Sequence, residues 1–359
     1  MLSYDAELVP ALSDADRALG ELAGLGRTMT NPHLLIGPFI RREAVLSSRI
    51  EGTQADIADL YAYEAGQLPL PGFKPAPPES DVHEVLNYVR TMEYGLKRLG
   101  TLPVSLRLMR ELHERLLEGV RGEQATPGEF RRSQNWIGRP NCTLNDATFV
   151  PPSVPEMLDA LGVLEKYIYQ ASEHPPLVRL GLIHYQFEAI HPFLDGNGRI
   201  GRLLISLLLV NWNLLPSPLL YLSAYFECHR QDYYDLLLAV SERGAWKDWL
   251  LFFIRGVAEQ ARDAITRAKR LQDLQLDWHK RLTHARASAL LLRLADSMFE
   301  SPLLTIPQAQ RILNLTYRSA QLNMEKLVAA GIVQPVGDAS YGKSFLAVEI
   351  LNVISEGQA

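Results

Sequence analysis

The sequence has few of the residues that build disulfide-linked or zinc-bound domains. Only two cysteines occur in 359 residues, Cys142 and Cys228, and no Cys-x-x-Cys pair is present. We therefore expect neither a disulfide framework nor a zinc site, and a reducing, cytoplasmic location. The N-terminal segment has early acidic residues and no apolar core, so we expect no signal peptide.

Long hydrophobic runs and a large charge of one sign are also missing. The longest apolar stretches, such as LLISLLLV at 203–210, are far shorter than the ~20 residues that cross a bilayer. We predict that they are core helices and that the protein has no membrane partner. The formal net charge of −5 gives no global attraction for nucleic acid.

Apolar residues recur at helical spacing through most of the chain, which predicts a mainly α fold. A proline-rich stretch at 68–80 cannot form a regular helix and is expected to be a linker. Asp81 and Ser105 are expected to cap the two helices after it. The predicted helices span about 12–24, 38–51, 81–98, 105–119, 154–172, 177–190, 199–213, 229–241 and 246–274.

Two segments depart from this pattern. Within 128–152, the strand-like residues 136–137 and 148–150 flank turn residues, which predicts a β-hairpin. Residues 305–333 are predicted to form helix, short turn and helix, ending at Gly331. VQPV and SFLAVEIL then flank the turn signal GDASYG, a pattern typical of a winged helix.

The stretch HPFLDGNGRIGR at 191–202 has the composition of an anion site. Gly196-Asn197-Gly198 precedes an apolar helix, where free backbone N–H groups and close approach favour phosphate. Arg199 and Arg202 are three residues apart and share a helix face beside it. Two guanidinium groups suit phosphate oxygens. We expect neither a P-loop nor a Rossmann site to accompany this stretch.

Asp195 and His191 complete the set. A carboxylate beside a bound polyphosphate is a usual anchor for Mg²⁺, and histidine titrates near neutrality and accepts a proton from a hydroxyl. Together these groups suit a nucleotidyl or phosphoryl transferase. Two simpler interpretations stay open: a polar turn before a buried helix, or a His191–Asp195 metal pair, for which no third ligand is evident.

The whole stretch resembles the Fic family signature, HxFx(D/E)GNGRxxR, at every defined position. HYQFEAI before it, the predicted hairpin, and QDYYDLLLAV after it are similar to other Fic elements. The resemblance implies a Fic-type helical core with a hairpin flap, preceded by an N-terminal helical segment and followed by a winged-helix domain. It implies an enzyme that transfers AMP from ATP to a Tyr, Thr or Ser hydroxyl of a target protein.

The resemblance also implies roles for the residues of the signature. His191 would be the general base and Asp195 would hold Mg²⁺ on the α- and β-phosphates. The backbone of Gly196, Asn197 and Gly198 would cradle the phosphates, with Asn197 positioning the α-phosphate. Arg199 and Arg202 would orient the outer phosphates, and Phe193 would anchor the loop. Residues 136–149 would be the flap that pairs with the target's backbone.

The adenine pocket is less well defined by the resemblance. Tyr234, then Tyr233, and Ser241 lie where the family lines this pocket. Packing of a helix into the core explains the two tyrosines equally well.

A second specific stretch, SSRIEG at 47–52, places Ser47 and Glu51 four residues apart on one helix face. An acid at a helix C-terminus faces the negative end of the dipole, at a cost of up to ~1 kcal/mol. Contact with solvent or with a surface lysine would be the simplest way to offset this cost. The stretch also resembles the inhibitory motif of Fic proteins, (S/T)xxxE(G/N). That resemblance implies that Glu51 pairs with Arg202 and blocks productive ATP binding within the same chain.

These expectations divide the chain into an N-terminal helical region at 1–75, a Fic catalytic domain at 76–275 and a winged-helix domain at 283–352. Some relatives with the inhibitory glutamate remove AMP, so a de-AMPylase that uses Glu51 is the alternative. A Doc-like phosphotransferase is disfavoured, because the GNGRxxR glycine and second arginine are intact here.

Partners are less constrained by the sequence. Residues 283–352 carry six Lys/Arg against five Asp/Glu, a weak electrostatic footprint for DNA. Tyr317, Arg318, Gln321 and Asn323 are the candidate base readers. The alternatives are protein docking or homodimer contacts, and a transcriptional regulator that senses nucleotide is the rival function. Self-modification, at tyrosines such as Tyr61 or Tyr63, is a further hypothesis.

Overall fold

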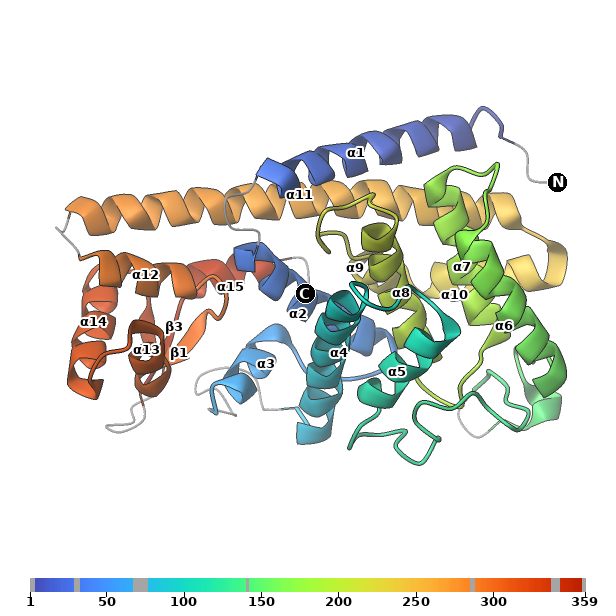
Figure 1. The fold of residues 1–359 in the computed structure, drawn as a ribbon, viewed down its shortest axis with the longest axis horizontal. Helices are drawn as coiled ribbons and strands as arrows, with labels where there is room; N and C mark the ends of the chain where they lie inside the picture. Colours follow the sequence, from blue (N-terminus) through green and yellow to red (C-terminus); the bar gives the residue numbers. More distant parts are fainter. Residues whose placement is uncertain are drawn as a thin grey trace.

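The computed structural model describes residues 4–28, 33–66, 77–139, 142–284, 288–336 and 343–356. The fold is mainly helical, as the apolar spacing predicts (Figure 1). The helices are α1 (Leu8–Thr28), α2 (His33–Ile50), α3 (Ile57–Glu64), α4 (Glu79–Arg98), α5 (Leu106–Leu116), α6 (Val154–Tyr169), α7 (Pro176–Ile190), α8 (Asn197–Asn211), α9 (Ser223–Cys228), α10 (Arg230–Arg243), α11 (Trp246–His284), α12 (Ala289–Ser297), α13 (Ile306–Leu313), α14 (Tyr317–Ala329) and α15 (Val348–Ser355).

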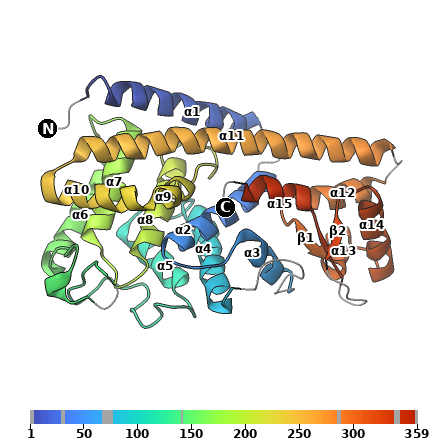
Figure 2. The same ribbon diagram turned by 180° about the vertical axis from the view of Figure 1, so that it is seen from behind.

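Helix α11, 39 residues long, forms the long axis of the molecule, and α1 lies along it (Figures 1 and 2). The packing face of α1 includes Leu8, Ala15, Leu19 and Leu22, all buried at helical spacing. The prediction at 246–274 found only the first part of α11, which continues by ten residues to His284.

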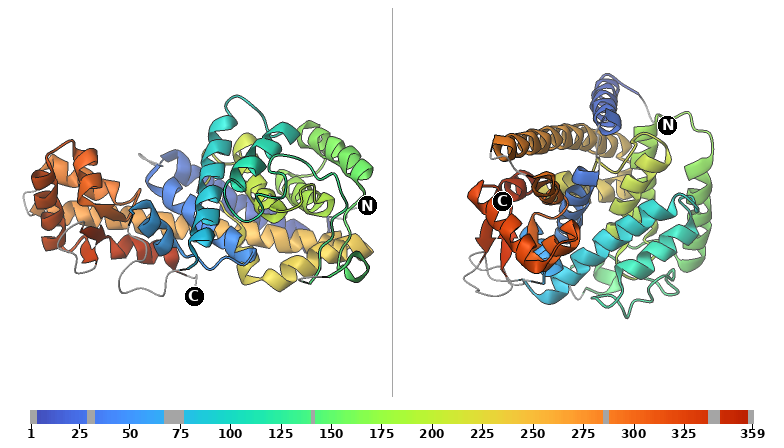
Figure 3. Two further views of the ribbon diagram at one scale, coloured as in Figure 1. Left: turned by 90° about the horizontal axis from the view of Figure 1, so that it is seen from below. Right: turned by 60° about the vertical axis from the view of Figure 1, so that its left-hand side comes forward.

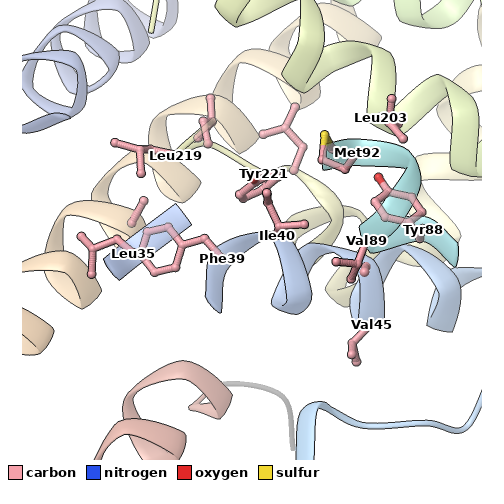
Figure 4. Close-up of a cluster of buried hydrophobic side chains, with 14 of the residues drawn as sticks. Leu35, Phe39, Ile40, Val45, Tyr88, Val89, Met92, Leu203, Leu219 and Tyr221 are labelled. Carbon is pink, nitrogen blue, oxygen red and sulfur yellow. The ribbon is translucent and has the colours of Figure 1, made fainter. Parts of the chain in front are cut away.

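Helix α2 lies in the interior, between α4, α8, α9 and the segment before α9. Its apolar residues pack with Tyr88 and Met92 of α4, Leu203 of α8 and Tyr221 (Figure 4). This buried position fixes the direction in which the end of α2 points. The predicted start at residue 38 was wrong: the helix begins at His33 and Pro38 lies inside it.

The start of α4 also differs from the prediction. The helix begins at Glu79 with Pro78 at the N-cap, so Asp81 does not cap it. Instead the Asp81 carboxylate accepts a hydrogen bond from the backbone N–H of Gln54 at 2.7 Å. Ser105 does cap α5, since its Oγ accepts from Leu108 N at 3.3 Å. Most of the predicted linker lies outside the described residues.

The predicted hairpin is reduced to one antiparallel bridge between Ile137 and Phe149. A single 3-10 turn, Leu144–Asp146, lies between the two segments. An isolated two-stranded ribbon is marginal on its own. Side chains next to this segment bind the backbone of the stretch 191–202.

The C-terminal unit contains the predicted helix–turn–helix, α13 and α14, and the two strands β2 (Gln334–Val336) and β3 (Ser344–Leu346) (Figure 3). Strand β1 (Leu303–Thr305) adds to β3, so the antiparallel sheet has the order β1-β3-β2. The second predicted strand was too long, because α15 begins at Val348. The GDASYG turn lies outside the described residues.

Two stretches match phosphate-loop patterns letter for letter, GNGRIG at 196–201 and GDASYGKS at 337–344. Neither has the context that such a loop requires, a strand followed by a helix. The first follows helix α7, and the second lies between the antiparallel strands β2 and β3. No helix among the described residues is long and apolar enough to cross a membrane.

We expect the substitution Leu22→Ala on α1 to lower the free energy of unfolding by about 2–5 kcal/mol, because it leaves a cavity against α11. Leu22 is fully buried, whereas Val9 on the same helix is 50% exposed. Urea unfolding followed by circular dichroism checks this, with Val9→Ala as the matched control. Equal effects of the two substitutions would contradict the packing of α1 on α11.

Candidate active site

The stretch 191–202 forms a tight loop between α7 and α8. His191 ends α7 in a left-handed conformation with φ of 48°, and Gly196 begins α8 in another with φ of 77°. The Asn197 side chain closes the loop: its Oδ1 accepts from Phe193 N and its Nδ2 donates to Phe193 O, both at 2.9 Å. Asn197 therefore shapes the loop, and both polar ends of its amide are occupied.

A second histidine supports the loop from α5. The His113 ring stacks on Phe193 with centroids 3.8 Å apart, and its Nε2 lies 3.0 Å from the backbone oxygen of Asp195. Its Nδ1 accepts from Gly128 N at 2.9 Å, which leaves Nε2 as the donor. Burial lowers the pKa of His113 to about 4, so the ring is neutral and its two bonds are fixed.

His191 is held in one orientation, with Nδ1 3.3 Å from the backbone oxygen of Glu188. The Nδ1–H donates to that carbonyl, so Nε2 is the nitrogen that can accept a proton. Burial lowers the pKa of His191 to about 4, although the Glu188 carbonyl and the charge of Glu51 oppose the shift. The imidazole is thus neutral near pH 7, and its pKa lies well below the neutral value expected from sequence.

Two residues just before the flap, Arg131 and Asn135, bind this loop. Arg131 Nε donates to the backbone oxygen of His191 at 3.0 Å, and Asn135 Nδ2 donates to that of Phe193 at 2.9 Å. Arg131 is almost completely buried. The residues of the single bridge, Ile137 and Phe149, are thereby held beside the loop.

Asp195 is the carboxylate at the mouth of the site, with a side chain 41% exposed. Its Oδ1 accepts from Gly196 N at 2.6 Å. Among the described residues, no group of three or more His, Cys, Asp or Glu side chains could hold a metal ion. The site fits Mg²⁺, which takes one or two carboxylates and completes its shell with phosphate and water oxygens. Within the part of the chain that the structure describes, a His191–Asp195 metal pair has no third protein ligand.

Arg202 and Glu51 lie in direct contact although they are 151 residues apart in the chain. Arg202 Nη2 donates to Glu51 Oε1 at 2.6 Å and to the backbone oxygen of Ser47 at 2.9 Å. Its Nε donates to Ser47 Oγ at 2.9 Å. The Arg202 side chain is 1% exposed and that of Glu51 30%.

Glu51 is ionised in this contact. Burial raises the pKa of its carboxyl, but the Arg202 charge and hydrogen bond outweigh burial and hold the pKa below its usual value. The residue directly follows α2, and Gly52 after it turns the chain with φ of 104°.

The Glu51 carboxylate also lies over the first turn of α8. A Cβ added to Gly198 would collide with Glu51 Oε1 and with the Arg202 guanidinium. Glu51 therefore fills space next to the backbone that begins α8. Gly198 is the residue whose small size permits this approach.

Arg199 is placed differently from Arg202. Its Nη1 donates to Glu84 Oε2 of α4 at 3.0 Å, and its Nη2 lies 3.9 Å from Asp195 Oδ1. Arg121 also contacts Glu84, at 3.5 Å. Arg199 thus links the N-terminal helices to the Asp195 loop.

The two tyrosines of α10 differ in their exposure to solvent. Tyr233 is buried and its hydroxyl lies 2.9 Å from His184 Nε2, so it belongs to the core. Tyr234 is exposed and lies near the guanidinium of Arg230. Ser241 Oγ lies 2.9 Å from the Tyr185 hydroxyl. Tyr234 is the α10 tyrosine left accessible to a ligand.

Sequence reasoning missed four residues that hold this site: Glu84, His113, Arg131 and Asn135. Glu84 carried a signal, because Tyr88 and Met92 follow it at helical spacing in the buried stripe of α4. A buried acid requires a buried partner. The other three act on backbone atoms of the loop, which no spacing in the sequence reveals.

Two sequence models of known families match the chain. The one described as "Fic/DOC family N-terminal" matches residues 9–97, and the one described as "Fic/DOC family" matches residues 103–209. Together they cover more than half of the 359 residues. With the loop geometry above, this shows that the chain belongs to the Fic/DOC family.

Curated relatives share part of this region. "Protein adenylyltransferase Fic" of Aedes aegypti is 32% identical over 141 residues, 39% of this chain and 25% of that protein. The protein of the same name from Drosophila willistoni is 33% identical over 132 residues, 36% of this chain and 24% of that protein. The chain spans about a quarter of the length of the curated relatives it matches.

Solved structures share the fold. A Fic family protein from Desulfovibrio desulfuricans G20 has a TM-score of 0.61 at 19% identity, over 96% of this chain and 97% of that one. A Fic-1 fragment from C. elegans has a TM-score of 0.53 at 20% identity, over 72% of this chain and 73% of that one. At these identities the likeness concerns the fold.

We expect Gly198→Ala to lower the free energy of unfolding by about 1–3 kcal/mol when Glu51 is present, because the methyl group overpacks the contact. In a Glu51→Gly background the loss should be smaller, since only the contact with the Arg202 guanidinium remains and alanine is the better helix former by up to ~1 kcal/mol. Urea unfolding of the four proteins of this double-mutant cycle gives the coupling. An equal loss in both backgrounds would show that Glu51 does not lie over Gly198.

Proposed function

We propose that this protein is a protein adenylyltransferase, which transfers AMP from ATP to a hydroxyl side chain of a target protein. The observation that carries the proposal is the Glu51–Arg202 contact over Gly198 within a complete Fic signature. Glu51 occupies the guanidinium and the start of α8, the two features suited to a terminal phosphate. We propose that it thereby inhibits the enzyme in cis, with Ser47 as the second contact on α2.

The roles of the remaining groups follow from their placement. His191 Nε2 would take the proton of the target hydroxyl as its oxygen attacks the α-phosphorus and pyrophosphate leaves. The backbone N–H groups of Asn197 and Gly198 would bind phosphate oxygens, assisted by Arg199 and Arg202, and that of Gly196 would join them on leaving Asp195 Oδ1. Asp195 would hold Mg²⁺, which would neutralise phosphate charge when bound. Tyr234 would line the adenine side.

The flap and the C-terminal unit would bind partners. The exposed side chains of Trp136 and Ile137 offer an apolar edge beside the loop to an extended target segment. Tyr61 is excluded as an acceptor for self-modification in the folded chain, because its side chain is almost completely buried. The Tyr63 hydroxyl lies 2.6 Å from His83 Nε2.

Protein docking is the better proposal for the winged helix than DNA binding. On α14, Gln321 donates to Glu325 at 2.9 Å, so an acidic side chain lies beside the candidate base readers. Asn323 donates to the backbone oxygen of Ser319 at 2.8 Å and is occupied. Tyr317 and Leu322 are exposed. The cations of this helix, Arg318 and Lys326, are accompanied by Glu325, so the face carries little net positive charge for phosphate contacts.

We expect Glu51→Gly to raise the rate of AMP transfer by about tenfold or more, a size typical of coupling between sites. His191→Ala in the same background should abolish transfer, because no base remains. Radiolabelled ATP with the purified protein and co-purifying proteins measures both. Equal labelling of the wild type and both variants would contradict the proposal. Loss of a pre-formed AMP adduct that requires Glu51 would favour the reverse, de-AMPylating activity.

The pH dependence of transfer by the Glu51→Gly variant should lack an acid limb near pH 6.5. The pKa of His191 is about 4, and removing Glu51 removes a charge that raises it. The base is unprotonated above this pKa, so the rate should stay level between about pH 8 and pH 5 and fall only toward pH 4. The pH profile of kcat/KM for ATP tests this, because kcat/KM reports the pKa of the free enzyme. A limb near the ordinary histidine pKa would show that His191 is not the base or is solvated.

A further inference from the structure

Each of the two signature arginines is bound by a carboxylate from the N-terminal helices. Glu51 follows α2 and binds Arg202, while Glu84 of α4 binds Arg199 at 3.0 Å. Glu84 precedes Arg199 by 115 residues, and the two side chains are only 3% and 1% exposed. The Arg202 contact has a role in the proposed function, whereas the Arg199 contact has none so far.

The two carboxylates differ in their freedom to withdraw. Glu51 lies one residue beyond its helix, beside a glycine and partly exposed, so a local change of the chain can remove it. Glu84 lies inside α4, with buried Val85 and Tyr88 after it. Its second carboxylate oxygen faces Arg121 at 3.5 Å. Removing Glu84 from Arg199 requires moving a packed helix.

The Glu84 contact determines which end of Arg199 faces the site. Nη1 is occupied by Glu84, while Nη2 lies 3.9 Å from Asp195 Oδ1, on the side of the phosphate-binding loop. The guanidinium is planar and rigid, so fixing one amino group sets the direction of the other. The carboxylate also compensates a buried positive charge when no ligand is bound.

We propose that Glu84 is a positioning residue for nucleotide binding: it holds Arg199 so that Nη2 faces the phosphates, and it is not a second inhibitory residue. This inference rests on the proposed function, because it assumes that a nucleotide binds at the loop. It assigns two opposite effects on one site to the segment 9–97, which matches the Fic/DOC N-terminal family model. Glu51 occupies the position of a phosphate group, and Glu84 orients Arg199 toward the phosphates.

The test uses Glu84→Gln in the Glu51→Gly background, where the inhibitory carboxylate is absent. Glutamine keeps the size and one acceptor oxygen but loses the charge. We expect the Kd for ATP with Mg²⁺, measured by isothermal titration calorimetry, to rise about 10-fold or more, as for other losses of a group that orients a ligand-binding residue. The KM for ATP should rise by a similar factor, with a smaller change in kcat. Glu93→Gln, exposed on the same helix, is the matched control.

Three results would overturn this role. Unchanged ATP affinity with a lowered melting temperature would mean a purely structural contact. Tighter binding, or higher transfer when Glu84→Gln is made with Glu51 intact, would mean a second inhibitory residue. If Glu84→Gln does not fold, Glu84→Asp keeps the charge but is too short to reach Arg199, and it should weaken ATP binding too; unchanged affinity there would overturn the role.

The same titration separates this inference from the proposed function. A Glu51→Gly protein that binds ATP but transfers no AMP would overturn the adenylyltransferase proposal and leave the Glu84 comparison measurable. A Glu51→Gly protein that binds no ATP would overturn both.

Discussion

A guanidinium with 1% of its side chain exposed needs its charge balanced inside the protein, and Arg202 finds that balance in Glu51. The position of α2 is fixed independently of this contact. One turn before Ser47, the buried Glu43 accepts hydrogen bonds from the hydroxyls of Ser223 and Tyr88. The end of α2 therefore reaches the start of α8 in a defined register, and Arg202 obtains its counter-charge without a ligand.

Thermodynamic linkage follows from this arrangement. If a phosphate and Glu51 compete for one guanidinium, whatever draws Glu51 away strengthens phosphate binding, and phosphate binding loosens the end of α2 to the same degree. The pair thus acts on the stability of a helix end as well as on the site. A partner that contacts the segment after Glu51 would change nucleotide affinity without touching the nucleotide.

Much of the fold and of the site could be predicted from the sequence, for identifiable reasons. Apolar spacing marks α4, α5, α7 and α8, and Gly196 and Gly198 mark a helix start where backbone is open to a ligand. The Ser47–Glu51 spacing placed both residues on the face that meets Arg202. These features can be predicted because they depend on spacing within one segment, or on the opposite charges of Glu51 in one motif and Arg202 in the other.

What the sequence did not reveal depends on tertiary contacts. The flap was expected to be a hairpin because of its β-prone residues, but it forms only one bridge. Arg131 and Asn135, just before the flap, hold it near the loop by binding carbonyl groups of the loop. The pKa of His191 was expected near neutrality, and burial lowers it to about 4. The helix start expected at Asp81 lies at Glu79, and Asp81 binds Gln54 instead.

The long helix α11 sets the scale of the molecule. Its 39 residues correspond to about 58 Å of helix. The second half of the helix binds the C-terminal unit: Arg267 donates to the backbone oxygen of Glu356 at 2.7 Å, and Trp278 donates to Glu349 at 2.9 Å. The helix therefore holds the C-terminal unit in a fixed position relative to α7, which packs on the same helix and ends at the loop. A partner bound to that unit would be held at a fixed distance from the loop.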